Sequence, residues 1–215
     1  MTRSVVAGIE GSVASPAADS WAAEEAGRRG GELVVFQAGV FGAAGLLAEM
    51  SAETGLVVLR SHGRGEVRDA VNGSVALRVA ATARCPVVVW GDPAHDGPVA
   101  VGVGNSDGGE RAPAFAFEAA ASRGAVLEAV HVSRGGMRRE RSVREQVTGW
   151  AGKRPGVPVR VHLVQARSDE RALAGISSGA QLIVVGGRGP VAGGRLGTMG
   201  DWLLGHADCP VAVVR

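Results

Sequence analysis

The stretch CPVVV at Cys85–Val89 returns as CPVAVV at Cys209–Val214, 124 residues further along the chain. The same offset relates Gly73-Ser74 to Gly197-Thr198. Solenoid repeats have periods of only ~20–50 residues, so a repeat at this much larger offset indicates two tandem domains.

Near the start of each copy the offset is smaller. Leu33 matches Leu127 at an offset of 94 residues, whereas the apolar run Leu56–Leu59 matches Leu182–Val185 at an offset of 126. The first copy therefore lacks a block of 32 residues that the second copy contains.

The domain boundary is predicted from composition. Residues 91–98 are rich in proline, glycine and aspartate, as expected of a linker. We therefore assign residues 1–92 to an abridged first domain and residues 97–215 to a complete second domain. A chain of 215 residues is long enough for two small domains.

Short runs rich in β-branched residues alternate with helical stretches in both copies, which predicts βαβ units and an α/β fold with a parallel sheet. The runs are apolar throughout, as in sheets that are covered on both faces. The missing block of the first copy is predicted to be one helix and an edge strand. We expect two tandem flavodoxin-like, doubly wound domains, with strand order 3-2-1-4-5 in the second and 2-1-4-5 in the first. The predicted strands are Val5–Ile9, Leu33–Gln37, Leu56–Leu59, Val87–Trp90, Val99–Val103, Val126–Val132, Val157–Val164, Leu182–Val185 and Val211–Val214.

Glycine-bearing loops follow the fourth strand position of each copy. One runs from residue 61 to Gly73-Ser74 and the other from Gly186 to Gly197-Thr198. Glycine lets the backbone approach a ligand closely, and a helix start directs free N–H groups at an anion. The loops are typical of a phosphate cradle, although tight turns between strand and helix would also explain their glycines.

Composition excludes several classes of function. Lys153 is the only lysine among 23 basic residues, and Arg154 follows it, so a GxxxxGK[ST] phosphate loop is absent. A net charge of +2 is too small to indicate nucleic-acid binding. No apolar run is long enough to cross a membrane, and two cysteines provide no disulfide framework. We expect a cytoplasmic protein without nucleic-acid or membrane partners.

The glycine loop, the helix behind it and the CPVxVV strand resemble those of the universal stress protein family over essentially the whole chain. The resemblance implies a nucleotide-binding α/β domain in which some members bind ATP through this loop. It also implies that the two domains form an intramolecular pseudo-dimer through their last strands, Val87–Trp90 and Val211–Val214, with a homodimer as a further possibility.

Neither copy has the complete family motif. Glu10 stands where the family has aspartate, and Arg60 replaces the first loop glycine of the first copy. In the second copy Gly104 replaces the aspartate, and the glycine spacer is two residues shorter. The candidate nucleotide-binding residues are Glu10, Arg60, His62, Gly63, Arg64, Gly73 and Ser74 in the first copy, and Gly186, Arg188, Gly189, Gly197 and Thr198 in the second.

These features predict a regulatory protein that binds an adenine nucleotide without dedicated catalysis. Mg²⁺ is expected only together with ATP, and the scattered histidines do not indicate a separate metal site. An alternative is a degenerate scaffold that has lost its ligand and acts through protein partners, for which the arginine-rich helix around Arg138–Arg144 offers a surface. Cys85 and Cys209 precede predicted buried strands and are expected to be packing residues rather than nucleophiles.

Overall fold

The computed structural model describes residues 3–10, 16–38, 42–60, 75–90, 96–104, 110–133, 137–187 and 196–215. Its first half contains β1 (Val5–Glu10), α1 (Pro16–Arg29), β2 (Leu33–Ala38), α2 (Ala43–Met50), β3 (Leu56–Arg60), α3 (Val75–Thr82) and β4 (Val87–Trp90). Its second half contains β5 (Val99–Gly102), α4 (Arg111–Arg123), β6 (Leu127–Ser133), α5 (Met137–Gly152), β7 (Val159–Gln165), α6 (Asp169–Ser177), β8 (Leu182–Gly186), α7 (Thr198–His206) and β9 (Val211–Val214).

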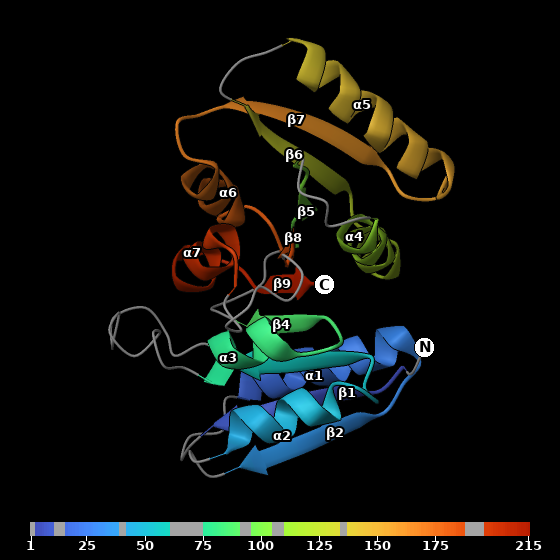
Figure 1. Cartoon of the computed structure of the whole chain (residues 1–215). Helices are drawn as coiled ribbons and strands as arrows, with labels where there is room; N and C mark the ends of the chain where they lie inside the picture. Colours follow the sequence, from blue (N-terminus) through green and yellow to red (C-terminus); the bar gives the residue numbers. More distant parts are fainter. Residues whose placement is uncertain are drawn as a thin grey trace.

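These strands form one sheet in the order β2-β1-β3-β4-β9-β8-β5-β6-β7 (Figure 1). The second half has the predicted order 3-2-1-4-5, and the first half has the shortened order 2-1-4-5. Within the described residues β2 has no strand on its outer side, and α2 follows it directly. The predicted loss of one helix and one edge strand from the first copy is therefore confirmed.

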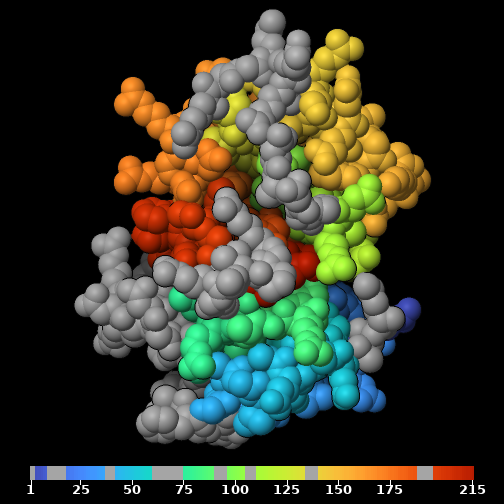
Figure 2. All heavy atoms as spheres, in the orientation of Figure 1, coloured from blue at the N-terminus to red at the C-terminus, as the bar shows by residue number. Residues whose placement is uncertain are grey.

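The two halves of the sheet join where β4 pairs with β9. This is the antiparallel pair of the sheet, with Val88 opposite Ala212 and Val87 opposite Val213. Val88 and Ala212 are equivalent under the offset of 124 residues, so the pairing is symmetric about them. Figure 2 shows the red spheres of the C-terminal segment directly against the green spheres around β4. The two strands expected at the contact between the halves do pair.

Helices cover both faces of the sheet. The buried residues of α1, α4 and α5 pack on one face, and those of α2, α3, α6 and α7 pack on the other. The strands contribute side chains to both layers, because successive residues of a strand point to opposite faces. The uninterrupted apolar runs in the sequence are explained by this two-sided cover.

Helices α1 and α4 contact each other across the junction between the halves. The Arg29 guanidinium carbon lies 5.1 Å from the ring centroid of Phe115, and that of Arg123 lies 5.6 Å from the ring of Trp21. Trp21 is equivalent to Phe115, and Arg29 to Arg123, at the offset of 94 residues. The two cation–π contacts are therefore reciprocal, as in an isologous interface.

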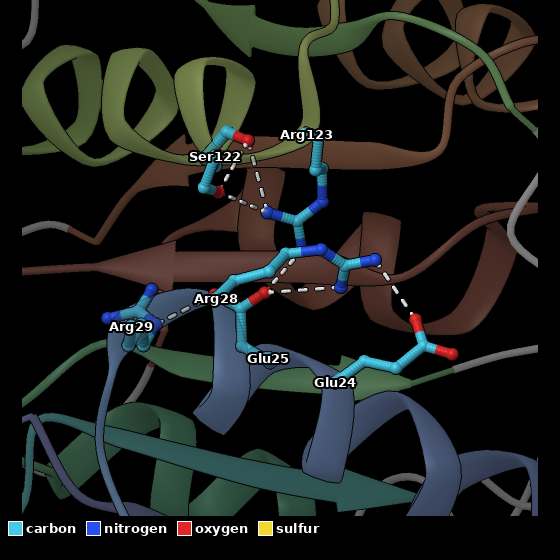
Figure 3. A network of polar contacts seen from close by, with 7 residues as sticks. Glu24, Glu25, Arg28, Arg29, Ser122 and Arg123 are labelled. Carbon is cyan, nitrogen blue, oxygen red and sulfur yellow. Dashed lines mark hydrogen bonds and ion pairs between the residues drawn. The ribbon is translucent and has the colours of Figure 1, made fainter.

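Glu25 of α1 breaks this symmetry. Its carboxylate accepts hydrogen bonds from Arg123 Nη2 at 2.6 Å and from Arg29 Nε at 2.7 Å (Figure 3). Its side chain is only 3 % exposed, and the equivalent residue of the second copy is Ala119. Burial alone would raise the pKa of Glu25, but the two arginines outweigh it and hold the pKa below its ordinary value.

One buried serine in each half makes the same hydrogen bond to the backbone. The Ser51 hydroxyl accepts a hydrogen bond from the backbone N–H of Arg84 at 2.8 Å, and the Ser177 hydroxyl accepts one from that of Asp208 at 2.7 Å. Each serine donates to a carbonyl three residues earlier. The contacts fix the turn before each cysteine, and neither serine belongs to a sequence motif described above.

Strand ends agree with the predicted ranges to within a few residues. Gly124 caps α4 in the left-handed conformation, and Ser168 caps α6 by accepting a hydrogen bond from the Arg171 N–H. The predicted strand Val157–Val164 begins later, at Val159, because Pro158 has no N–H to donate to a ladder. None of the described helices combines the length and apolar character needed to cross a bilayer.

Candidate functional site

The candidate site of each half lies where the strand order reverses. β1 lies between β2 and β3, and β5 lies between β6 and β8. In open parallel sheets, ligands bind in the crevice outside the carboxyl ends of the strands at such a position. The glycine loops begin at these ends, after β3 in the first half and after β8 in the second.

In the first half the structure fixes only the strand ends of the predicted site. Glu10 is the last residue of β1, and Arg60 is the last residue of the neighbouring strand β3. Their backbones therefore reach the same edge of the sheet. The other candidates of this half lie outside the described residues, as do two of the second half: His62, Gly63, Arg64, Gly73, Ser74, Arg188 and Gly189. Their roles stay predictions.

The second half shows both ends of its glycine loop. Gly186 ends β8 and is exposed. Gly197 caps α7 with an extended backbone, and Thr198 is the first, exposed residue of that helix. The first amides of a helix have no acceptor within it, so the start of α7 offers N–H groups to an anion. Asp201 in the same first turn places a negative charge nearby, which opposes anion binding.

Arg215 lies against this loop, although it belongs to none of the sequence motifs. The Gly187 N–H donates to the Val214 carbonyl at 2.6 Å, and a Cβ at position 187 would lie 2.8 Å from Arg215 Cγ. The absence of a side chain at Gly187 thus makes room for Arg215. Arg111 at the start of α4 donates from Nη1 to the Arg215 carbonyl at 3.0 Å, which fixes the backbone there.

The Arg215 guanidinium is incompletely satisfied. Its Nε is buried and has no hydrogen-bond partner among the described residues. Burial also lowers the pKa of Arg215, because removal from water disfavours the charged form. A buried, unpaired donor next to a glycine loop is suited to an anionic ligand. The parallel pairing of β8 with β9 brings Arg215 there, and that register is the signal that could have identified it.

His131 of β6 is a second polar group outside the sequence motifs. Its Nδ1 lies 2.8 Å from the Val103 carbonyl, which can only accept, so Nδ1 carries the proton. Its Nε2 is buried without a partner among the described residues. The hydrogen bond from the ring therefore fixes the backbone at Val103, directly after β5.

A comparison with protein-family models identifies the fold and its repeat. The model of the universal stress protein family matches residues 39–90 and 97–215. The chain belongs to the universal stress protein family. Curated universal stress proteins of Mycobacterium bovis and Mycobacterium tuberculosis are each 36 % identical to it over 192 residues, covering 79 % of this chain and 64 % of the relative. The chain thus spans less than two thirds of the length of these relatives.

Solved structures agree with the fold of this universal stress protein. A crystal structure of a universal stress protein from Archaeoglobus fulgidus has a TM-score of 0.67 at 22 % identity, and covers 91 % of this chain and 74 % of its own. A protein of unknown function from Pseudomonas aeruginosa has a TM-score of 0.67 at 18 % identity, covering 99 % and 92 %. At these identities the likeness concerns the fold alone.

The cysteines of this universal stress protein are buried and free. Burial raises the pKa of Cys85 to about 11 and that of Cys209 to about 12. A thiol with such a pKa is protonated near neutral pH and is a poor nucleophile. This agrees with the packing role predicted for both residues. Within the described ranges no group of three or more metal-ligating side chains occurs.

Proposed function

We propose that this universal stress protein binds an adenine nucleotide, with ATP as the expected ligand, in at least one half and without dedicated catalysis. The observation that carries the proposal is the strand-order reversal in both halves, with a glycine-bearing loop at the carboxyl ends of the strands on each side. Two such positions in one sheet give the chain two candidate sites.

The chemistry of the described loop ends supports a phosphate ligand. In the second half the N-terminus of α7, the Thr198 hydroxyl and the unpaired Nε of Arg215 are donors at one edge of the sheet. The chain has no lysine in either loop, so phosphates would be bound by backbone N–H groups, hydroxyls and arginine. Mg²⁺ would enter only with the nucleotide.

The first half is the better candidate by sequence. It retains Gly63, the nine-residue spacer and Gly73-Ser74, whereas the spacer of the second half has seven residues. The second half also carries Asp201 in the first turn of α7, which reduces its attraction for a phosphate. We therefore expect the two halves to differ in affinity.

Universal stress proteins have been crystallised with dAMP and with cAMP. Those structures match this chain with TM-scores of only 0.45 and 0.47, over 55 % of its length. The proposal therefore depends on the geometry of this chain and on its family membership.

We further propose that the two halves imitate a dimer of single domains, on the basis of the symmetric β4–β9 pairing. We also propose that the protein acts in the cytoplasm with reduced cysteines.

The alternative is a scaffold that has lost its nucleotide. The arginine-rich helix α5 is its candidate partner surface, but the exposed Arg141 of this helix is already paired with Glu145 at 3.0 Å. Such an i, i+4 pair is typical of a solvated helix face. We therefore rank the scaffold second.

Isothermal titration calorimetry with ATP, with and without Mg²⁺, tests the proposal. The parent chain is compared with a first-half double variant, Gly73→Val with Ser74→Ala, and a second-half double variant, Gly197→Val with Thr198→Ala. Ser178→Ala, at an exposed serine outside both loops, is the matched control. We expect the first-half variant to lose most of the binding heat. No heat from the parent at millimolar ATP would refute nucleotide binding, and a loss confined to the second-half variant would relocate the site.

A further inference from the structure

At one end of the nine-stranded sheet, no strand within the described residues covers the outer edge. β2 is the last strand on the side of the first half, and its sequence LVVFQA contains neither a charged residue nor proline. Val34 is 42 % exposed and Val35 is 52 % exposed. Proteins usually protect an edge strand with charged side chains, proline or a covering element, because its unpaired backbone groups can recruit another chain.

The other end of the sheet is protected in this way. β7 carries Arg160 and His162, whose side chains are 67 % and 43 % exposed. Both lie within 4 Å of Glu128 on the neighbouring strand, so this edge presents charged and polar groups to solvent. The contrast between the two ends of one sheet singles out β2.

The second half shows how the equivalent strand is covered. Val35 corresponds to Ala129 of β6 at the offset of 94 residues, and Ala129 is only 1 % exposed. β7 pairs with the outer side of β6, and α5 packs above with buried Val143, Val147 and Trp150. The first half lacks this helix and strand, yet the residues of β2 are as apolar as those of a covered strand. An apolar edge without its intramolecular cover is suited to an intermolecular one.

The backbone groups available for such pairing follow from the ladder with β1. The Glu32 carbonyl accepts a hydrogen bond from the Val5 N–H at 2.8 Å, so the polar groups of Glu32 face β1. Backbone groups alternate in direction along a strand, so those of Val34 and Phe36 also face β1. The N–H and C=O groups of Leu33, Val35 and Gln37 face outward, where no described strand pairs with them.

We propose that two copies of this chain associate by antiparallel pairing of β2 with β2 of the second copy. The β4–β9 junction shows that two valine-rich strands of this fold pair antiparallel about a symmetry point. Pairing centred on Val35 places Val35 opposite its own copy, and Leu33 opposite Gln37. These are the residues whose backbone groups face outward, and they give about six interchain hydrogen bonds.

The side-chain pairs that this register creates across the two β2 strands are favourable. Val34 lies opposite Phe36 of the second copy, a favourable pairing of a β-branched with an aromatic residue. Glu32 lies opposite Ala38, so the two Glu32 side chains remain six positions apart. A two-fold interface of this kind is closed and leaves only the two polar β7 edges at the ends of the joined sheet.

Sedimentation velocity of the full chain over a range of concentrations tests the proposal. We expect a single species of twice the chain mass at tens of micromolar. Val35→Lys places two like charges directly opposite each other and should weaken association at least tenfold, giving the mass of one chain. Val35→Pro removes an outward N–H without removing a hydrogen bond to β1, and should act in the same direction.

The control is His162→Lys at the protected edge, which should leave the mass unchanged. Thermal unfolding shows whether each variant is folded, and Val35→Lys should melt close to the parent because Val35 is half exposed. A parent chain that is a monomer at 100 µM, a polydisperse aggregate, or a dimer that persists in folded Val35→Lys would each overturn the proposal. ATP binding is measured separately, so the failure of either proposal leaves the other testable.

Discussion

Replacing Glu25 by glutamine tests whether the buried ion cluster between α1 and α4 holds the two halves together. The Glu25 carboxylate contacts Arg123 at 2.6 Å, and the Arg123 side chain is only 4 % exposed. Removing the charge leaves Arg123 buried without a counter-ion, and breaking such a pair costs about 3–5 kcal/mol. Glutamine keeps the volume and one acceptor oxygen, so we expect a loss near the lower end, about 3 kcal/mol.

The assay is urea unfolding followed by circular dichroism, with the slope of the transition compared between variants. Glu24→Gln is the matched control, since the Glu24–Arg28 pair is exposed and such pairs contribute about 0–1 kcal/mol. Glu25→Met with Arg123→Met removes both charges and should recover much of the loss, because an apolar replacement of a whole buried pair is often neutral.

The stability of the parent should also depend on pH in a defined direction. The folded-state pKa of Glu25 lies below the ordinary value of 4.5, so the ionised carboxylate stabilises the fold fully above about pH 4.5. This contribution is lost as the pH falls through the folded-state pKa, and Glu25→Gln should lack that part of the acid sensitivity. A loss below 1 kcal/mol for Glu25→Gln, or a double variant as unstable as the sum of its singles, would refute the reasoning.

Further predictions concern the duplicated serine, the glycine loop and the thiols. Ser177→Ala leaves a backbone N–H unsatisfied and should cost about 1–3 kcal/mol in urea unfolding, whereas exposed Ser178→Ala should change stability by less than about 0.5 kcal/mol; equal losses would contradict this. Gly187→Ala should destabilise by about 1–3 kcal/mol through overpacking, and Arg215→Ala should relieve it by removing the clashing Cγ; a variant that Arg215→Ala fails to rescue would contradict the contact. Both cysteines should resist a thiol reagent at pH 8 in the folded protein and react on unfolding, and fast labelling of folded protein would contradict their burial.

Most of the fold could be predicted because the sequence contains two copies of the same domain pattern. The offsets 94, 124 and 126 locate the missing helix and strand, and the family resemblance implied the pairing of the two repeated CPVxV strands, β4 and β9, that the structure shows at the junction. The uniform apolar character of the runs indicates a sheet covered on both faces. The location of the missing block depends on a pattern that two segments share, whereas the two-sided cover follows from each run by itself.

Features present in one copy only could not be predicted in this way. Glu25 occupies a helix with Arg28 and Arg29, which resembles an ordinary surface pair, and its third partner, Arg123, is 98 residues away. Arg215 depends on the register between β8 and β9, which places its side chain over Gly187. For the candidate site, spacing predicted the strand ends and the start of α7, whereas the contribution of a distant arginine required tertiary pairing.

The junction of β4 with β9 has a consequence for how the two halves can diverge. In a dimer of separate chains every substitution occurs on both sides of the interface, and association weakens on dilution. Here one polypeptide carries both partners, so their effective concentration is set by the connecting chain rather than by expression level. A carboxylate can then arise in one half alone, as at Glu25 opposite Ala119, and serve arginines from both. Covalent linkage thus frees each half to specialise while their contact persists at any protein concentration.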